Sequence, residues 1–179
     1  DSVNHLNELL EDFLSIGKLE EGKMGISVSA FTVKEFMEDV VDEMRFHLKK
    51  EQEIVLTTSG EPIFVTDKRM LKNILLNLLS NAIKFSPEGK KIYMRAENAD
   101  GKLSITVKDE GLGIPEEDQQ HLFSTFFRAK NVSNIQGTGL GLPIVKTYVT
   151  LLGGVIELQS KLNEGTTITV RLPSLQNTN

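Results

Sequence analysis

NILLNLLSNAIKFSPEGK, residues 73–90, is a leucine-rich stretch with asparagine at positions 73, 77 and 81. Residues four apart lie nearly one above another on a helix, so these carboxamides form a stripe that Lys84 extends. The apolar side chains of the same helix cluster on a separate arc: Leu71, Ile74, Leu75, Leu78, Leu79 and Ala82. The pattern predicts a helix that packs one side into a core and carries amides at the edge of that core.

The asparagine stripe has two readings. A solvated helix face is the simpler one, although lysine or glutamate favours a helix more than asparagine does. The other reading is a ligand site, because an asparagine at a core boundary offers a neutral oxygen to a hard cation and an amide to an acceptor. Such a site suits Mg²⁺ that is already bound by phosphates, and Lys84 lies within reach of those phosphates.

The composition limits the class of protein. A chain of 179 residues with 39% apolar residues can form one domain plus a short appendage. The absence of cysteine excludes disulfides and thiolate metal sites. The net charge of -5, with 25 acidic against 20 basic residues, argues against a nucleic-acid surface but not against a small anionic ligand. No apolar run is long enough to span a bilayer, and we expect no signal peptide.

Helical periodicity extends beyond the asparagine stretch. Residues 1–16 are amphipathic and read as part of a longer helix. Thr32 and Glu35 form a capping-box pattern before a second helix, and Asp67 is the predicted cap of the asparagine helix. The predicted core face of the second helix is Phe36, Met37, Val40, Val41, Met44 and Leu48. Pro115 marks another helix start, and a last helix ends near residue 152.

Strand-like runs pair as hairpins. Residues 91–98 and 102–109 alternate around an Asn-Ala-Asp-Gly turn, and residues 155–160 and 166–172 form a closing hairpin. Shorter β-like runs cover 53–58 and 62–65. We therefore predict an α+β fold, a two-layer α/β sandwich in which helices cover one face of a mixed, mostly antiparallel sheet.

Two glycine-rich segments add to the asparagine stripe. In KDEGLGIP, residues 108–115, a carboxylate at a strand end adjoins glycines that let a flat ligand approach, although a plain strand-and-turn reading suffices for this segment alone. In QGTGLGLPIVK, residues 136–146, glycines precede a helix whose first amides can bind phosphate. Neither a dinucleotide-binding motif nor a P-loop fits, because a polar loop precedes the glycines and no Gly-Lys-Ser/Thr sequence is present.

Taken in order, these segments resemble the ATP-binding catalytic domain of sensor histidine kinases, in the superfamily shared with gyrase, heat-shock chaperones and mismatch-repair ATPases. NLLSNAIKFS is similar to the asparagine box, DEGLGIP to the first glycine box, LFSTFFR to the phenylalanine box and GTGLGL to the second glycine box. GGVIELQSKLNEGTTITVRLP resembles the closing strands of the family. The resemblance covers about residues 26–173.

The resemblance implies Mg²⁺ and phosphate ligands. Asn77 and Asn81 would hold Mg²⁺ and position the triphosphate of ATP, and Lys84 would contact phosphate oxygens. Arg128 would reach the γ-phosphate from a short lid, residues 129–137. Asn77, Lys84 and Arg128 are therefore the implied catalytic residues, and the nucleotide would lie between the helices and the lid.

The resemblance also implies an adenine pocket. Asp109 would accept a hydrogen bond from the adenine amine, helped by Gly111 and Gly113, and Phe85 would line the site. Thr167 would support the adenine through water. The hinge of the lid and its phosphate amides would come from a run of five residues, Gly137, Thr138, Gly139, Leu140 and Gly141.

One position separates phosphoryl transfer from hydrolysis. In the related ATPases a glutamate four residues before the metal asparagine activates water, whereas this chain has Asn77, which cannot take a proton. His5, His47 and His121 are each followed by leucine rather than by an acid, as a phosphoacceptor histidine of the family would be. We therefore expect the acceptor to lie upstream of this chain.

The resemblance predicts three parts: residues 1–24 as the end of a dimerisation and phosphoacceptor helix with its linker, residues 25–175 as the catalytic domain, and residues 176–179 as a tail. The implied function is ATP-dependent phosphorylation of a histidine in two-component signalling. The implied partners are the phosphoacceptor domain, a homodimer partner and a response regulator, without nucleic acid. We expect a cytoplasmic domain, whether or not the sensor is membrane-anchored. Two alternatives remain open: a nucleotide-binding regulatory module without transfer activity, and a serine kinase of the type that inhibits sigma factors.

Overall fold

The computed structural model describes residues 25–176, together with residues 7, 10, 11, 14, 16–18, 21 and 22. The predicted helix over residues 1–16 therefore falls largely outside the described residues, as do most of the predicted segment 1–24 and the last three residues. Within the described part, no helix combines the length and apolar character needed to cross a membrane.

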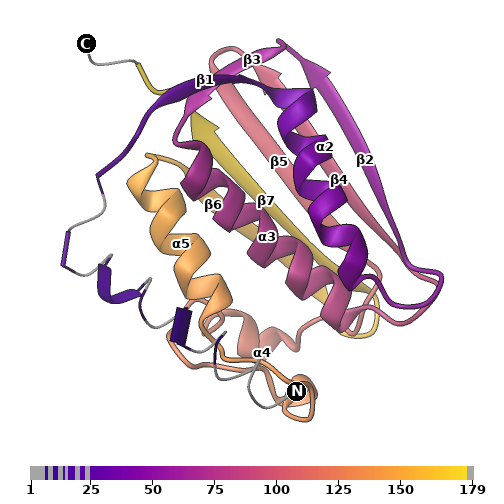
Figure 1. The fold of residues 1–179 in the computed structure, drawn as a ribbon. Helices are drawn as coiled ribbons and strands as arrows, with labels where there is room; N and C mark the ends of the chain where they lie inside the picture. Colours follow the sequence, from indigo (N-terminus) through magenta and orange to yellow (C-terminus); the bar gives the residue numbers. More distant parts are fainter. Residues whose placement is uncertain are drawn as a thin grey trace.

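A five-stranded sheet forms one layer of the molecule (Figure 1). Its strands follow the order β2 (Glu53–Gly60), β4 (Lys91–Ala99), β5 (Lys102–Asp109), β7 (Gly165–Pro173) and β6 (Val155–Lys161). The pair β2 and β4 is parallel, and the other neighbours are antiparallel. A separate antiparallel pair joins β1 (Ser29–Thr32) to β3 (Ile63–Thr66). The mixed, mostly antiparallel sheet predicted from the sequence is confirmed.

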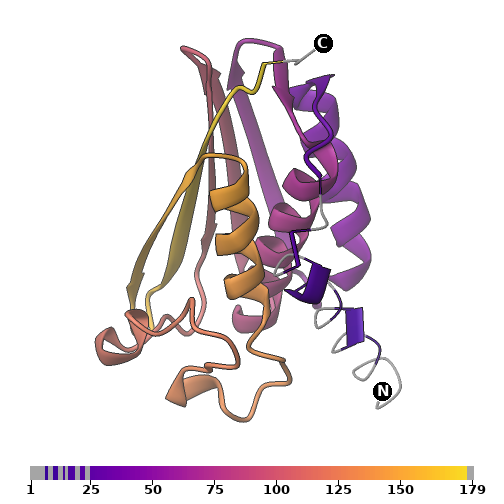
Figure 2. The ribbon, with the colours of Figure 1, turned by 90° about the vertical axis from the view of Figure 1, so that its left-hand side faces the viewer.

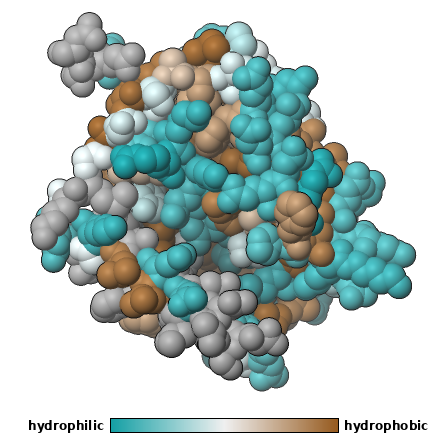
Figure 3. Space-filling view, in the orientation of Figure 1, coloured by the Kyte–Doolittle hydropathy of each residue, from teal (hydrophilic) through white to brown (hydrophobic). Residues whose placement is uncertain are grey.

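Three helices form the second layer and cover one face of the sheet, as the side view shows (Figure 2). They are α2 (Val33–Met44), α3 (Lys68–Phe85) and α5 (Gly141–Leu151). The remaining helical elements are short: η1 (Arg45–His47), α4 (Glu116–Gln119) and η2 (Lys130–Val132). The two-layer α/β sandwich is therefore confirmed. Hydrophilic side chains cover most of the outer, helical face, with smaller apolar patches between them (Figure 3).

The core lies between the two layers. Alternate residues of β4 and β5 are buried, and the apolar arc of α3 packs against them with little or no exposed surface. The predicted apolar face of α2 is buried as far as Met44, whereas Leu48 lies beyond the helix and is only partly buried. At the predicted hairpin turn, Asp100 and Gly101 have φ of 53° and 70°, the left-handed values that a two-residue turn requires.

The two predicted helix caps differ in outcome. Asp67 caps α3, because its carboxylate accepts hydrogen bonds from the amides of Arg69 and Met70. The capping box predicted at Thr32 and Glu35 is wrong, since the Thr32 side chain makes no capping bond. Thr32 is also the last residue of β1, and the amide of Val33 donates to the carbonyl of Pro62.

Replacement of Asp67 tests this cap. Its Oδ1 accepts from the amides of Arg69 and Met70, and its Oδ2 accepts from the amide of Ser27 at 2.7 Å. Asp67→Ala therefore removes these three bonds and the ion pair with Arg69 from a fully buried position. We expect a loss of about 2 kcal/mol or more in the free energy of unfolding, measured in urea. Asp67→Asn is the matched control, because its oxygen retains the cap, and it should cost clearly less. Equal losses in the two variants would contradict the assigned cap.

Candidate functional site

The carboxamide stripe of α3 faces the first turn of α5. Asn73, Asn77 and Asn81 are all half-buried. The Asn77 side-chain nitrogen donates to both the backbone and the side-chain oxygen of Asn73, at 2.9 and 2.8 Å. A Cβ atom placed on Gly141 would lie 3.1 Å from the Asn77 Oδ1 and 4.0 Å from the Asn81 Nδ2. The stripe is therefore part of an interface between α3 and α5 rather than an ordinary solvated face.

The loop after β5 is held against the last turn of α3. The amide of Leu112 donates to the carbonyl of Phe85 at 3.2 Å. A Cβ on Gly111 would overlap that carbonyl, and one on Gly113, where φ is +63°, would overlap the carbonyl of Lys161. Glycine at these two positions is required by close backbone approach. The loop thus brings Asp109 beside the end of α3.

Asp109 is a buried carboxylate, with 9% of its surface exposed. It accepts hydrogen bonds from the amides of Gly111 and Thr166, of which the first measures 2.9 Å. Burial raises the pKa of Asp109 to about 6, and the two hydrogen bonds offset only part of that effect. Because the group is a poorly solvated acceptor, an amine donor that reaches it would be held strongly.

The structure places Thr167 away from Asp109, contrary to the sequence expectation. In the β5–β7 register, Asp109 pairs with Thr166, so the two side chains share the face that the helices cover. Thr167 is the next residue along the strand and lies on the opposite face. Thr166 is therefore the residue beside Asp109, and Ser160 Oγ lies 2.8 Å from the Thr166 hydroxyl oxygen. Sequence reasoning missed both.

A signal for Thr166 was present in the sequence. The apolar residues of β7 occupy even positions, Ile168, Val170 and Leu172, and the period-two rule puts Thr166 on their face. The same rule puts Ser160 on the face of Ile156 and Leu158, because exposed and partly buried residues alternate along β6. Its hydroxyl accepts from the amide of Ile114 at 2.9 Å and so helps to hold the loop after β5.

Two cations converge on Gly137. A Cβ placed there would lie 3.9 Å from the Lys84 Nζ and 4.0 Å from the Arg128 Nε. The Arg128 Nη2 donates to the carbonyls of Val132, at 2.8 Å, and Ile135. The structure thus brings Lys84 and Arg128 together beside the second glycine segment, and carbonyls of the loop already bind the Arg128 guanidinium.

The predicted lid is joined to its neighbours by hydrogen bonds at both ends. The amide of Lys130 donates to Asp118 at 2.9 Å, and the Asn131 side chain donates to the carbonyl of Gly113 at 2.9 Å. At the other end, Phe126 donates to the carbonyl of Gly139, whose φ is +71°. Figure 1 shows this segment at the end of the molecule where α3 ends and α5 begins.

The second glycine segment leads directly into α5. Thr138 Oγ1 accepts from the amide of Leu140 at 3.1 Å, and the Leu140 side chain is fully buried, so only its backbone faces the site. No side chain in the described part caps α5. The amides of Gly141 and Leu142 are therefore available to an anion, whereas Pro143 has no amide hydrogen to offer.

The residues fit Mg²⁺ only when the ion arrives with anionic ligands. The described residues contain no group of three or more histidine, aspartate or glutamate side chains that could hold a metal. Asn77 uses its nitrogen on Asn73, which leaves its oxygen on the side toward Gly141. Carboxamide oxygens of Asn77 and Asn81 beside Lys84 suit a cation whose charge is already met by phosphates.

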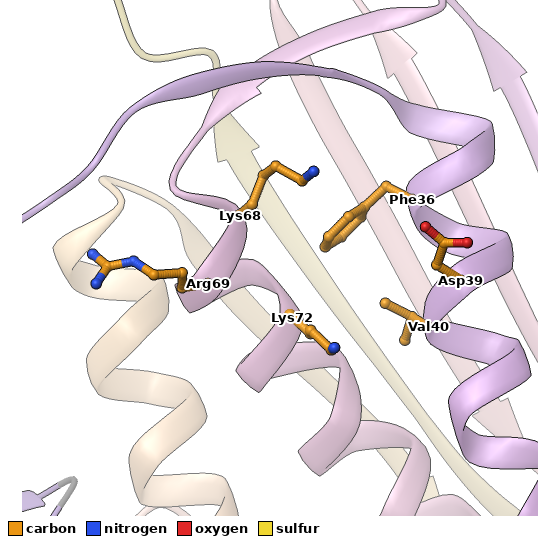
Figure 4. Close-up of a pocket in the computed structure, with 6 residues that line it drawn as sticks. All are labelled: Phe36, Asp39, Val40, Lys68, Arg69 and Lys72. Atoms are coloured by element: carbon orange, nitrogen blue, oxygen red, sulfur yellow. The ribbon is translucent and has the colours of Figure 1, made fainter.

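A surface pocket between α2 and α3 is separate from this site (Figure 4). Its volume is about 230 Å³. It lies beside the first turn of α3, about 24 Å along the helix from Lys84. The cations on its wall already have partners: Lys72 pairs with Glu43, Arg69 with Asp67, and Lys68 lies over the Phe31 and Phe36 rings. This pocket is therefore not the anion site. The lining residues are Phe36, Asp39, Val40, Lys68, Arg69 and Lys72.

Asp109→Asn should stabilise the nucleotide-free chain. The raised pKa means that the ionised carboxylate destabilises the fold above about pH 6, and that this cost is relieved as the pH falls toward the ordinary value of 3.8. We expect the variant to gain up to about 3 kcal/mol in urea unfolding at about pH 7.5 and much less at about pH 4.5. A difference between variant and parent that does not change with pH would contradict the assignment.

Comparisons with known proteins agree with this geometry. The model of the histidine kinase-, DNA gyrase B-, and HSP90-like ATPase family matches residues 66–176. Histidine protein kinase DivJ of Caulobacter vibrioides is 35% identical over 98% of this chain and 30% of its own length, and sensor histidine kinase WalK of Bacillus subtilis is 34% identical over 97% and 29%. The chain therefore spans less than a third of the length of these two relatives.

Solved structures show the same fold. ShkA, solved as the full-length protein in complex with AMPPNP, has a TM-score of 0.85 at 25% identity and covers 99% of this chain and 38% of its own. The nucleotide-free catalytic domain of histidine kinase ThkA has a TM-score of 0.72 at 29% identity over 84% of this chain and 97% of its own. The match to the family model covers more than half of the sequence and includes Asn77, Asp109 and Gly141. The chain therefore belongs to the histidine kinase-, DNA gyrase B-, and HSP90-like ATPase family.

Proposed function

We propose that this chain binds Mg-ATP and donates the γ-phosphoryl group to a histidine on a preceding dimerisation domain, as the catalytic domain of a two-component sensor histidine kinase. The observation that carries the proposal is the convergence of four segments on one site: the amides of α3, Asp109 with its glycine loop, Arg128, and the uncapped start of α5. The likeness to ShkA, solved with AMPPNP, and to curated histidine kinases supports it.

Adenine recognition would fall to Asp109. Its buried carboxylate accepts only two backbone amides, and the glycines beside it let a flat base approach. Thr166 and Phe85 line the same end of the site. A base with an exocyclic amine at this position satisfies the acceptor, whereas guanine presents a carbonyl there and leaves two acceptors facing each other.

The triphosphate would lie between α3 and α5. Lys84 and Arg128 approach Gly137 from two elements and would meet the charge of the phosphates, and the first amides of α5 would add donors. Asn77 and Asn81 would hold Mg²⁺, which supplies charge neutralisation on the phosphates when bound. The Arg128 guanidinium donates hydrogen bonds to two carbonyls of the lid. To reach the γ-phosphate, it must break these bonds and donate to phosphate oxygens instead.

The site favours transfer over hydrolysis. Between Asn73 and Lys84 the sequence has no acidic residue that could activate water. The Asn77 amide cannot take a proton, and it is hydrogen-bonded to Asn73. The histidines do not supply a better acceptor. His47 and His121 are exposed, and the ring of His121 packs on Phe127 at 5.5 Å, while His5 lies outside the described residues. The acceptor histidine would come from the preceding domain.

The wider role follows from this assignment. The proposed partners are the phosphoacceptor domain, a second copy of the kinase and a response regulator that takes the phosphoryl group, and the proposed location is the cytoplasm. The regulatory-module alternative predicts nucleotide binding without transfer. The sigma-factor alternative predicts transfer to a serine and therefore a phosphoryl bond that resists acid.

Asn81→Ala tests the metal role. The variant should lose about tenfold or more in affinity for Mg-ATP, because the lost oxygen acts through the metal. Its affinity for ADP without metal should change by less than about twofold. Calorimetry on the two ligands measures both numbers, with Ser80→Ala as a neighbouring control on the same helix. Equal losses with and without metal would remove Asn81 from the metal site.

Transfer itself is tested with a longer version of the protein that includes the preceding domain. In that version Asp109→Asn disables its own nucleotide site. Adding the 179-residue chain and γ-labelled ATP should place label on the longer chain, whereas the 179-residue chain alone should stay unlabelled. The label should be lost in acid, as a phosphohistidine is, and Arg128→Ala in the donor should reduce the rate about tenfold or more.

Three outcomes would contradict the proposal. Acid-stable label would favour serine transfer, and binding of ATP without any transfer would favour the regulatory module. Acid-labile label on His5, His47 or His121 of the isolated chain would show that the acceptor is not upstream.

A further inference from the structure

The last turn of α3 is held from outside by two side chains of the loop between η1 and β2. We propose that Lys49 and Gln52 are positioning residues for phosphate binding, which act by fixing the place of Lys84. The proposal rests on the proposed function and extends it to residues outside the nucleotide site. In Figure 1 the ends of α2 and α3 lie at the same end of the sheet, where this loop connects α2 to β2.

Gln52 is the buried one of these two side chains, with 8% of its surface exposed. Its Nε2 donates to the carbonyls of Ile83, Ser86 and Pro87, at 3.2, 3.0 and 3.1 Å. Its Oε1 accepts from the amide of Lys49 at 2.8 Å. Both ends of the Gln52 carboxamide are therefore used, and the side chain links the loop to α3.

Lys49 is the exposed one of the two side chains. Its Nζ donates to the carbonyls of Lys84 and Ser86, at 2.8 and 2.7 Å. The last carbonyls of a helix have no partners within it and carry a partial negative charge, so an ammonium group there is favourable. Ser86 leaves the helix in an extended conformation and Pro87 follows, which means that no left-handed glycine caps this end. Lys49 and Gln52 take over that role.

The last turn of α3 contributes residues to the proposed nucleotide site. Lys84 belongs to this turn, with its backbone carbonyl bound by Lys49 and its ammonium group beside Gly137. The next residue, Phe85, offers its carbonyl to Leu112 on the inner side. This turn is thus fixed between the side chains of Lys49 and Gln52 on one side and the loop next to Asp109 on the other. If the hydrogen bonds from Lys49 and Gln52 are lost, the backbone of Lys84 is free to move. Its ammonium group is then no longer held in a fixed position for binding the phosphates.

A helix cap that serves stability alone would behave differently. It would lower the unfolding midpoint and leave the ligand preference of the folded protein unchanged. A positioning role instead predicts a loss that is specific for phosphate and that depends on Lys84. Lys49→Met and Gln52→Met remove the donors with little change in side-chain volume. Lys50→Met is the matched control, because it removes the same charge from a neighbour whose side chain makes none of these bonds.

The experiment measures calorimetric affinities for Mg-ATP and for adenosine in the 179-residue chain, each with Lys84 present and with Lys84→Met. With Lys84 present, Lys49→Met and Gln52→Met should weaken Mg-ATP about tenfold and adenosine less than about twofold. With Lys84→Met, the same changes should weaken Mg-ATP by less than about twofold, because the group they position is gone. Lys50→Met should stay within about twofold throughout, and Lys49→Arg should restore binding.

Equal losses in the two Lys84 backgrounds, or equal losses for Mg-ATP and adenosine, would overturn the positioning role. Lys49 is exposed, so its variant keeps the test usable if the buried Gln52 change unfolds the chain. A failure of the proposed function looks different. The unchanged chain would then not bind Mg-ATP, which would refute the nucleotide site together with the positioning role that rests on it.

Discussion

The packing of α3 against the sheet is the constraint on which the site depends. Its apolar arc, from Met70 to Ile83, is buried almost completely, and this fixes the rotation of the helix about its own axis. Once the rotation is set, the asparagine stripe must lie at the edge of the core and face α5. Each other part of the site is then defined by a contact with α3: Leu112 at Phe85, Gly137 near Lys84, and Gly141 near Asn77.

The second constraint is electrostatic. Asp109 is buried without full compensation for its charge, and its raised pKa shows that the ionised form costs stability. A surface aspartate would cost less folding stability, but water would satisfy its hydrogen-bonding capacity. The buried carboxylate is instead a strong acceptor for a donor that reaches it.

Much of this architecture could be predicted from the sequence, because it rests on local patterns. The period of the apolar residues indicated α3, the turn at Asp100 and Gly101 indicated the hairpin, and Asp67 indicated the start of α3. The association of these segments with ATP came from a resemblance and not from periodicity. The structure confirms that the segments meet, while the roles of the individual residues remain predictions.

The failures of sequence reasoning share a physical cause, since each concerns a partner that is distant in sequence. Thr32 makes no capping bond and ends β1, whose partner is β3. Thr167 is the residue predicted from the sequence, whereas the β5–β7 register pairs Asp109 with Thr166. Gln52 gave no local signal at all, because its bonds cross more than thirty residues to the end of α3. Local rules predict elements, but the contacts between elements need the fold.

The most direct test of the account is a heteronuclear NMR titration of the isotopically labelled chain with Mg²⁺ and AMPPNP. The account predicts that the largest amide shifts fall in the C-terminal half of α3, in residues 109–113 and in residues 137–142. It also predicts that the pocket between α2 and α3, around Phe36 and Lys68, stays unchanged. Shifts centred on that pocket, with the residues around Asp109 unaffected, would contradict the assignment of the site.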